Sequence, residues 1–308
     1  SRYVRAIAER YAQTTTVLAY DLLNEPLPYH WADAFGDDLM GLYRELTAAV
    51  REVDQHHLLM YEGTRWATDF SGFTSRLDDN SALQFHKYWS RPDQGSLSHF
   101  LEVAGRLDVP LYMGEGGENT LDWNAAAVAL YERLGISWCI WPYKTIGRAT
   151  SLCAIQPPTD WAALTGFESG RSSADDRARA AQALAELEDR LLTRPEQLNR
   201  PLFHTLMRKP PLRLPAPAFA LASPGVEVHW PDNFDFGGGQ NPDTALEAAV
   251  ELPAGGMVEY SISAPPGDIT AVVAEGEVRI EVESAAGAHR IRVCADRPAV
   301  LRAVVVAD

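Results

Sequence analysis

The stretch DLLNEP, residues 21–26, places an asparagine and a glutamate directly after an apolar run, and PLYMGEGGEN, residues 110–119, places a second glutamate after another. Proline has no backbone N–H to give to a sheet ladder, so the strand before Pro26 is expected to end there. Glu25 and Glu115 therefore stand where two buried strands end. A carboxylate in such a place needs a partner or a chemical task, because burying an unpaired charge is costly.

Apolar runs alternate with amphipathic stretches from about residue 15 to residue 143. The helix-like stretches cover roughly 33–53, 96–107 and 122–134, and a further one covers 174–192. Nearly continuous apolar strands between helices indicate a parallel sheet that is buried on both faces. The expected strands are TVLAYDLLNEP (16–26), HLLMYEG (57–63), ALQFHKYW (82–89), PLYMGEGG (110–117) and ISWCIWPY (136–143).

Two architectures fit this alternation: an open doubly wound sheet and a (β/α)8 TIM barrel. The doubly wound sheet predicts a GxGxxG loop after an early strand, and the sequence has none. The barrel predicts polar and aromatic residues at several strand ends, which every run above shows. We therefore expect an α/β protein with a (β/α)8 barrel. Because five strands are counted, they are expected to be strands 4 to 8, and a missing N-terminal barrel segment is expected to supply the others.

The composition changes near residue 210, where KPPLRLPAPAFALASPG (209–225) is rich in proline. Proline-rich stretches are typical of linkers. Beyond this one, short strands with alternating polarity, clearest in EVRIEVE (277–283) and HRIRV (289–293), predict a small all-β sandwich. The expected domains are the C-terminal part of the (β/α)8 barrel (1–209), a linker (210–220) and a β-sandwich (221–308).

Two carboxylates at strand ends on one barrel face suit glycoside hydrolysis. One donates a proton to the leaving oxygen, and the other attacks the anomeric carbon or activates water. His86 and Tyr88 are two residues apart and share one face of their strand. The glycines around Glu115 are expected to leave room for a ligand.

Further side chains near the strand ends are candidate substrate contacts. Asn24 carries an amide that can hydrogen-bond a sugar hydroxyl, and Lys144 carries an ammonium that can do the same. Trp141 offers an apolar plane for a pyranose ring. Trp66, in a loop expected to form a substrate wall, and Glu118, just beyond Glu115, complete the set.

The ordered motifs NEP, HxY, GE and a final Trp, each closing its strand, resemble glycoside hydrolase family 5, the cellulase family of clan A, over about residues 1–165. The resemblance implies a retaining (β/α)8 glycosidase, with Glu25 as acid/base and Glu115 as nucleophile. It also implies that Tyr88 hydrogen-bonds the nucleophile, that Asn24 and His86 contact the sugar, and that Trp141 lies under it. The arginine and histidine that the family takes from its early strands have no counterpart in this chain.

The C-terminal region resembles the jelly-roll carbohydrate-binding modules of families 6 and 35. The similar parts are DNFDFGGGQNPD (232–243), the GxxVEYSI run (255–262) and GAHRIRV (287–293). A structural sandwich that shields the barrel is the alternative for this region.

Charge and composition exclude several partners. The 308 residues carry 42 acidic and 27 basic side chains, for a formal charge of −15. Such a surface repels phosphate backbones and anionic lipids, so neither nucleic acid nor membrane is expected as a partner. Three dispersed cysteines and unclustered histidines predict no metal and no cofactor.

The sequence thus predicts a retaining β-glycosidase of a β-linked glucan, most simply an endo-β-1,4-glucanase. Activity on β-mannan, β-1,3-glucan or a glucosyl lipid stays open, as does a non-catalytic sugar-binding protein. A polymeric substrate implies a secreted or periplasmic site of action, although no signal peptide is visible in this chain.

Overall fold

The computed structural model describes residues 1–166, 174–192, 194–231, 245–265, 269, 271–285 and 287–307. Its internal contacts divide it into two compact units. The first, called here the barrel unit, contains Ser1–Gly116 and Ala126–Cys139. The second, called the C-terminal unit, contains Gly117–Ala125 and the described part of Ile140–Asp308. None of the helices in the described ranges combines the length and apolar composition that a bilayer span requires.

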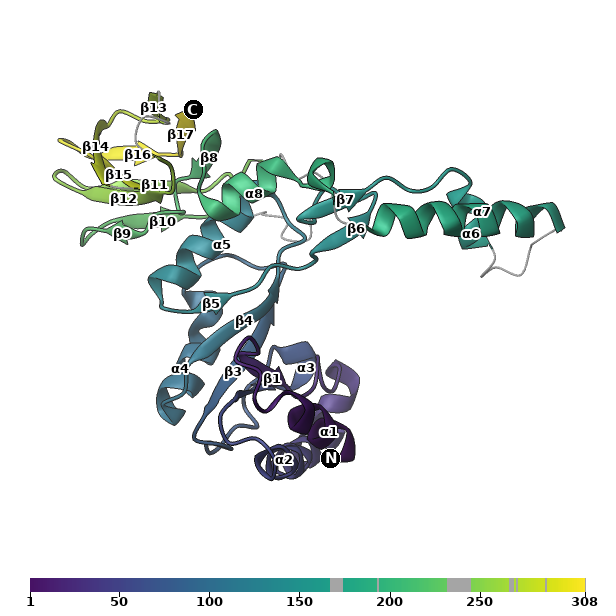
Figure 1. The fold of residues 1–308 in the computed structure, drawn as a ribbon. Helices are drawn as coiled ribbons and strands as arrows, with labels where there is room; N and C mark the ends of the chain where they lie inside the picture. Colours follow the sequence, from purple (N-terminus) through teal and green to yellow (C-terminus); the bar gives the residue numbers. More distant parts are fainter. Residues whose placement is uncertain are drawn as a thin grey trace. The chain divides into compact units, whose positions relative to one another are not determined.

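The barrel unit is built on one parallel sheet (Figure 1). Its strands lie in sequence order: β1 (Ala19–Asp21), β2 (Leu58–Glu62), β3 (Ser81–Lys87), β4 (Leu111–Gly116) and β5 (Ser137–Trp138). Helices separate them: α1 (Arg2–Tyr11) precedes β1, and α2 (Tyr29–Arg51), α3 (Thr64–Ala67), α4 (Ser98–Leu107) and α5 (Leu121–Arg133) follow. A doubly wound sheet reverses its strand order, whereas this consecutive order is that of a (β/α)8 barrel. The predicted α/β fold is confirmed.

The core of the barrel unit lies between the sheet and its helices. All seven residues of β3 are buried, as expected of a central parallel strand. The ring of Phe85 on β3 stacks on Phe100 of α4 with centroids 4.5 Å apart, while Leu59 and Met113 are at most 1% exposed. The packing therefore fixes the strands whose ends carry the polar residues.

Two strands are shorter than predicted. β1 ends at Asp21 rather than at residue 26, and β5 ends at Trp138 rather than at residue 143. The chain beyond β1 leaves the ladder because Glu25 and Leu27 adopt left-handed backbone conformations, with φ of 45° and 56°. Glu25 thus lies in a loop beyond the strand and not on the strand itself.

The C-terminal unit contains three antiparallel sheets, as the alternating pattern predicted (Figure 1). The first sheet is β10 (Glu227–His229), β11 (Ala249–Leu252) and β16 (Ala299–Leu301). The second is β14 (Arg279–Ala285), β15 (Ala288–Cys294), β12 (Met257–Ile262) and β9 (Leu221–Ala222), and the third is β13 (Ala271–Ala274), β17 (Ala303–Ala307) and β8 (Leu212–Pro215). Alternating burial is clear on β15, whereas β14 is mostly exposed because it is the edge strand of its sheet.

The same unit contains the elements between residues 140 and 207. They are a parallel pair, β6 (Lys144–Ile146) and β7 (Cys153–Ile155), and the helices α6 (Trp161–Thr165), α7 (Ala174–Leu191), η3 (Pro195–Gln197) and α8 (Arg200–Met207). The division after Cys139 therefore differs from the predicted barrel domain, which ran to residue 209. The motif DNFDFGGGQNPD (232–243) lies outside the described residues.

The predicted linker at 210–220 is not a free connection. Leu212–Pro215 forms strand β8, which pairs with β17, and Ala216 continues the pairing through its N–H to the Arg302 carbonyl. Ala216 is fully buried. Pro215 is tolerated in this strand because β8 lies at the edge of its sheet, where a missing N–H donor breaks no central ladder.

Candidate active site

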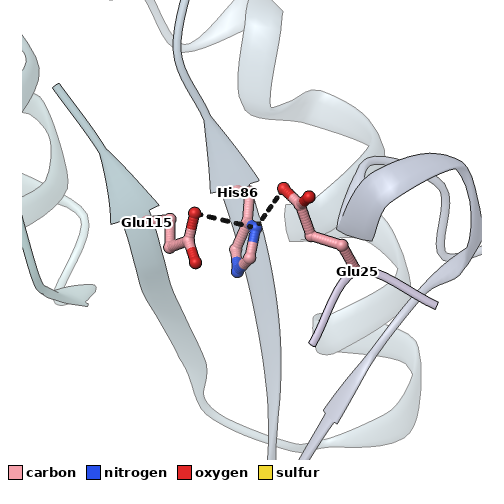
Figure 2. A group of neighbouring side chains, drawn as sticks. All are labelled: Glu25, His86 and Glu115. Atoms are coloured by element: carbon pink, nitrogen blue, oxygen red, sulfur yellow. Dashed lines mark hydrogen bonds and ion pairs between the residues drawn. The ribbon is translucent and has the colours of Figure 1, made fainter. Parts of the chain in front are cut away.

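Three side chains from neighbouring parts of the parallel sheet converge at its carboxyl end (Figure 2). Glu25 comes from the loop after β1, His86 from β3 and Glu115 from β4. His86 lies between the two carboxylates, with its Nδ1 2.8 Å from Glu25 Oε1 and 3.6 Å from Glu115 Oε2. One ligand-type atom from each residue lies within 4.8 Å of the others. The two glutamates predicted as a catalytic pair are thus brought together.

Local irregularities of the backbone aim these groups at one another. The register of β3 against β4 shifts between Phe85 and His86, which pairs His86 with Glu115. Such a bulge redirects the side chains that follow it. Beyond the bulge, the Tyr88 hydroxyl donates a 2.7 Å hydrogen bond to Glu115 Oε2, the contact that the family resemblance implied.

The charge state of His86 follows from its surroundings. The side chain is almost fully buried, and burial alone would lower its pKa. The Glu62 and Glu25 carboxylates that contact its ring, together with the charge of Glu115, outweigh burial and raise the pKa of His86 to about 9. His86 is therefore an imidazolium at neutral pH and carries the positive charge between the carboxylates.

This pKa predicts how stability depends on pH. Because the pKa of His86 is raised from 6.5 to about 9 on folding, protonation stabilises the fold. The stabilisation is fully present below pH 6.5 and is lost as the pH rises through about 9. Urea titrations of the chain and of the H86Q variant would measure this. We expect the difference between their unfolding free energies, chain minus variant, to fall as the pH rises across this window. An equal pH slope in both proteins would contradict the assignment.

Sequence reasoning missed the layer beneath His86. Glu62, the last residue of β2, is fully buried, and its Oε1 lies 3.2 Å from His86 Nε2. Gln84 of β3 donates from Nε2 to both Glu62 Oε1 (2.5 Å) and Asp21 Oδ2 (2.7 Å). Asp21, the last residue of β1, is solvent-exposed. Even so, desolvation by the surrounding protein and the charge of Glu62 raise the pKa of Asp21 to about 7. The sequence offered one signal for this layer: Gln84 is a polar residue inside the otherwise apolar run ALQFH.

The glycine before Glu115 makes room for this layer rather than for a ligand. A Cβ on Gly114 would lie 2.2 Å from Cδ and 2.6 Å from Nε2 of Gln84. These distances are far below van der Waals contact, so any side chain at this position displaces Gln84. The expectation that the glycines open space for substrate is thus replaced, at Gly114, by a packing role.

The G114A variant is expected to lose about 1–3 kcal/mol of unfolding free energy, as overpacked cores do. The matched control is G105A in α4, where a Cβ would meet nothing within 4 Å. There the same change is expected to stabilise by about 0.5–1 kcal/mol, because alanine is the better helix former. Urea unfolding of both variants measures this contrast, and equal effects of the two changes would refute the packing role.

A cavity of about 790 Å³ opens beside Glu25. It is lined by Glu25, Tyr29, Trp66, Thr68, His86, Lys87, Tyr88, Trp89, Ser90, Ser96, His99 and Phe100. Its size falls within the range of small-molecule sites, about 300–1,000 Å³. Three of the predicted contact residues, Trp66, His86 and Tyr88, thus line the same cavity as Glu25.

Trp66 reaches the cavity from an unusual turn. Arg65, Trp66 and Ala67 all have left-handed φ values, from 57° to 59°. Such conformations cost free energy in residues other than glycine and persist only where surrounding contacts hold them. Arg65 supplies those contacts, since its N–H bonds the Leu27 carbonyl (2.7 Å) and its guanidinium pairs with Asp33 and Asp69.

The remaining predicted contacts are not among the residues that line this cavity. Asn24 is exposed in the loop next to Glu25. Trp141, Lys144 and Glu118 belong to the C-terminal unit. Trp141 is 47% exposed, and the Lys144 ammonium donates to the Leu191 carbonyl (2.8 Å). Glu118 pairs with Arg148 at 3.0 Å. A sugar contact from Lys144 or Glu118 would require an exchange of these partners, and the roles of all four residues stay predictions.

Two groups of described residues could also hold a metal ion by the criterion of donor spacing. One is the set Glu25, His86 and Glu115, and the other is the exposed set Glu227, His229 and Glu251. Without a metal the carboxylates around His86 keep its ring protonated, so coordination would require a ring nitrogen to lose its proton. At neutral pH the geometry is therefore better suited to moving protons and stabilising charge.

Two carboxylates that face each other at the carboxyl end of a parallel sheet are the arrangement that glycoside hydrolysis requires. Comparison with known families is more specific. Residues 1–146 match the family model "Cellulase (glycosyl hydrolase family 5)". Over these residues the chain is therefore similar to family 5 glycoside hydrolases.

Individual relatives are more distant. A protein named Endoglycoceramidase from Hydra vulgaris is 26% identical over 166 residues, which are 48% of this chain and 32% of the relative. A Beta-xylosidase from Phanerodontia chrysosporium is 33% identical over 84 residues, covering 27% of this chain and 17% of the relative. The chain thus spans about a third or less of the curated relatives that it matches.

Among solved structures, an endoglucanase from Thermotoga maritima matches with a TM-score of 0.40 and 19% identity, over 46% of this chain and 57% of that one. A beta-glucanase from Saccharophagus degradans matches with a TM-score of 0.40 and 19% identity, over 46% of this chain and 50% of that one. The carbohydrate-binding resemblance of the C-terminal region stays a prediction, because the matched family model ends at residue 146.

Proposed function

We propose that the protein is a retaining β-glycosidase that hydrolyses β-linked glucans, acting as an endo-β-1,4-glucanase with Glu25 and Glu115 as its catalytic pair. The observation that carries the proposal is the spacing of the two carboxylates: one oxygen of Glu25 lies within 4.8 Å of one oxygen of Glu115. Retaining enzymes hold the two carboxyl groups about 5–5.5 Å apart, whereas inverting enzymes need about 6.5–9.5 Å to admit a water molecule.

The chemistry proceeds in two steps. Glu25 donates its proton to the glycosidic oxygen while Glu115 attacks the anomeric carbon, so the C–O bond to the leaving sugar breaks and an ester to Glu115 forms. Glu25 then takes a proton from water, whose oxygen attacks the anomeric carbon and releases Glu115. The Tyr88 hydrogen bond orients the attacking carboxylate (2.7 Å), and the His86 imidazolium reduces the repulsion between the two glutamates.

A second substrate class, a β-glucoside with a lipid aglycone, is favoured by the cavity. The residue that protonates the leaving group, Glu25, lies in its wall, and five of the lining residues are aromatic: Tyr29, Trp66, Tyr88, Trp89 and Phe100. Such a wall suits an apolar leaving group as well as a sugar ring. One of the relatives is named as an endoglycoceramidase.

The remaining parts of the proposal concern the whole protein. Among the described residues the parallel sheet has five strands, and a closed (β/α)8 barrel has eight. We therefore include in the proposal that a further barrel segment completes the site. Degradation of a polysaccharide also implies a secreted or periplasmic protein, since such a polymer does not enter cells.

Substrate assays test this proposal directly. The chain, and a longer polypeptide in which three strand–helix units complete the barrel at its N-terminus, would be incubated with cellotetraose, a β-1,3-glucan, a β-mannan and a detergent-dispersed β-glucosyl lipid. New reducing ends from cellotetraose support the endoglucanase, and release from the lipid alone supports the second class. Binding of sugar by both polypeptides, without any release from any substrate, would overturn the enzymatic reading in favour of a sugar-binding protein.

A further inference from the structure

Glu62 is held in place more tightly than its strand-end position requires. Its side chain is fully buried, and its backbone is clamped by Tyr43 of α2. The Tyr43 hydroxyl donates to the Glu62 carbonyl (2.9 Å) and accepts from the Glu62 N–H (3.1 Å). Tyr43 is itself fully buried, so the root of the Glu62 side chain has a fixed position.

The Glu62 carboxylate then reaches Glu25 by two routes. Glu62 Oε2 accepts a 2.6 Å hydrogen bond from the Glu25 backbone N–H, and Glu62 Oε1 lies 3.2 Å from His86 Nε2. The other ring nitrogen of His86 lies 2.8 Å from the Glu25 carboxylate. Glu62 therefore holds both the backbone and, through His86, the side chain of Glu25.

The backbone route matters because Glu25 has a left-handed conformation, with φ of 45°. Non-glycine residues rarely adopt this region, and they do so where surrounding contacts over-determine them. A hydrogen bond to a charged, buried acceptor is among the stronger contacts available to a backbone N–H. Without it, the loop after β1 loses the bond that fixes where Glu25 points.

We propose that Glu62 is a positioning residue of the site, which fixes the acid/base Glu25 through its backbone N–H and holds the His86 cation between the two catalytic carboxylates. The inference rests on the proposed function only for its kinetic consequence. Glu62 does not line the cavity, so it acts through Glu25 and His86 and not on the substrate.

The E62Q variant tests this role because it keeps the shape of the side chain and removes its charge. The two carboxylate oxygens accept from the Glu25 N–H and from Gln84, whereas the amide keeps one oxygen acceptor and its new NH2 group faces one of these donors. We expect kcat to fall about 10–100-fold. KM should change less than about 2-fold, because Glu62 makes no contact with the substrate.

A second readout does not depend on turnover. The groups that face His86 are Glu62, Glu25 and Glu115, with Asp21 acting at longer range. Removing the Glu62 charge is expected to lower the midpoint of the His86 NMR titration from about 9 to below about 8. If neither wild type nor variant hydrolyses any substrate, the proposed function fails while this titration still tests the contact between Glu62 and His86.

The matched control is D54N. Asp54 is also a buried carboxylate that pairs with a histidine, at 2.5 Å from His57 Nδ1, but it lies before β2 and not at its carboxyl end. D54N is expected to lower stability without moving the His86 midpoint, kcat or KM. If E62Q does not fold, E62D replaces it: the shorter acid keeps the charge, so the midpoint stays near 9 while kcat falls. A His86 midpoint in E62Q equal to that of wild type would overturn the proposal.

Discussion

Replacing Glu115 with glutamine is expected to lower kcat by about 10⁴-fold or more, the largest effect of any substitution in this protein. Glutamine has nearly the shape of glutamate, but its neutral amide cannot form the ester intermediate that retention requires. The fold should be little affected, since Glu115 is about half-buried and the Tyr88 hydroxyl can donate to the amide oxygen as it does to the carboxylate.

The control for this variant is E102Q on α4, an exposed glutamate remote from the strand ends. It undergoes the same chemical change and is expected to keep kcat within about 2-fold of wild type, as surface substitutions do. We expect E115Q to bind cellotetraose as wild type does, which equilibrium titration with this sugar would measure. Wild-type rates in E115Q would remove Glu115 from the mechanism.

The second largest effect is expected from E25Q. Loss of a general acid/base typically costs about 10²–10⁴-fold in rate. The loss should depend on the leaving group, because a dinitrophenolate departs without a proton whereas a sugar alkoxide does not. We therefore expect the rate on cellotetraose to fall by the full amount. With dinitrophenyl β-cellobioside, the rate of the first step, formation of the glycosyl–enzyme, should fall much less.

Added azide provides the internal control for E25Q. Azide needs no base to attack the glycosyl–enzyme, so it should restore turnover of the dinitrophenyl substrate and yield the β-glycosyl azide. The matched E102Q variant should show no response to azide. An equal rate loss on both substrates, with no response to azide, would mean that Glu25 supports the structure and does not transfer protons.

Much of the barrel unit was predictable because its elements follow local rules. The helices α2, α4 and α5 and the strands β2, β3 and β4 lie where hydrophobic periodicity placed them. Their consecutive parallel order follows from the alternation of strands and helices. The pairing of Glu25 with Glu115 followed from the fold, since strand ends of a barrel meet at one face.

The polar layer beneath the site was not predictable, because it depends on neighbours across the sheet. Glu62, Gln84 and Asp21 come from three strands, and their contacts appear only when the register of β1, β2 and β3 is known. The early end of β1 was missed for a similar reason. Pro26 marks a break in any context, but the left-handed turn at Glu25 depends on the acceptor that Glu62 offers.

The proline-rich stretch near residue 212 shows the limit of composition. Prolines favour linkers on average, yet Leu212–Pro215 pairs with β17 as an edge strand. Only the tertiary pairing partner decides between these outcomes. The same limit applied to Gly114, whose missing side chain is required by Gln84 from the adjacent strand.

The most direct test of the central claim is covalent labelling with a 2-deoxy-2-fluoro β-cellobioside that carries an activated leaving group, followed by intact mass and peptide mapping. It would use whichever polypeptide, the chain or its barrel-completed form, hydrolyses cellotetraose. The retaining mechanism predicts one adduct, on the peptide that contains Glu115, which slowly disappears as activity returns. An adduct on another residue, or continued hydrolysis of cellotetraose with no adduct at saturating reagent, would contradict the assignment of Glu115 as the nucleophile.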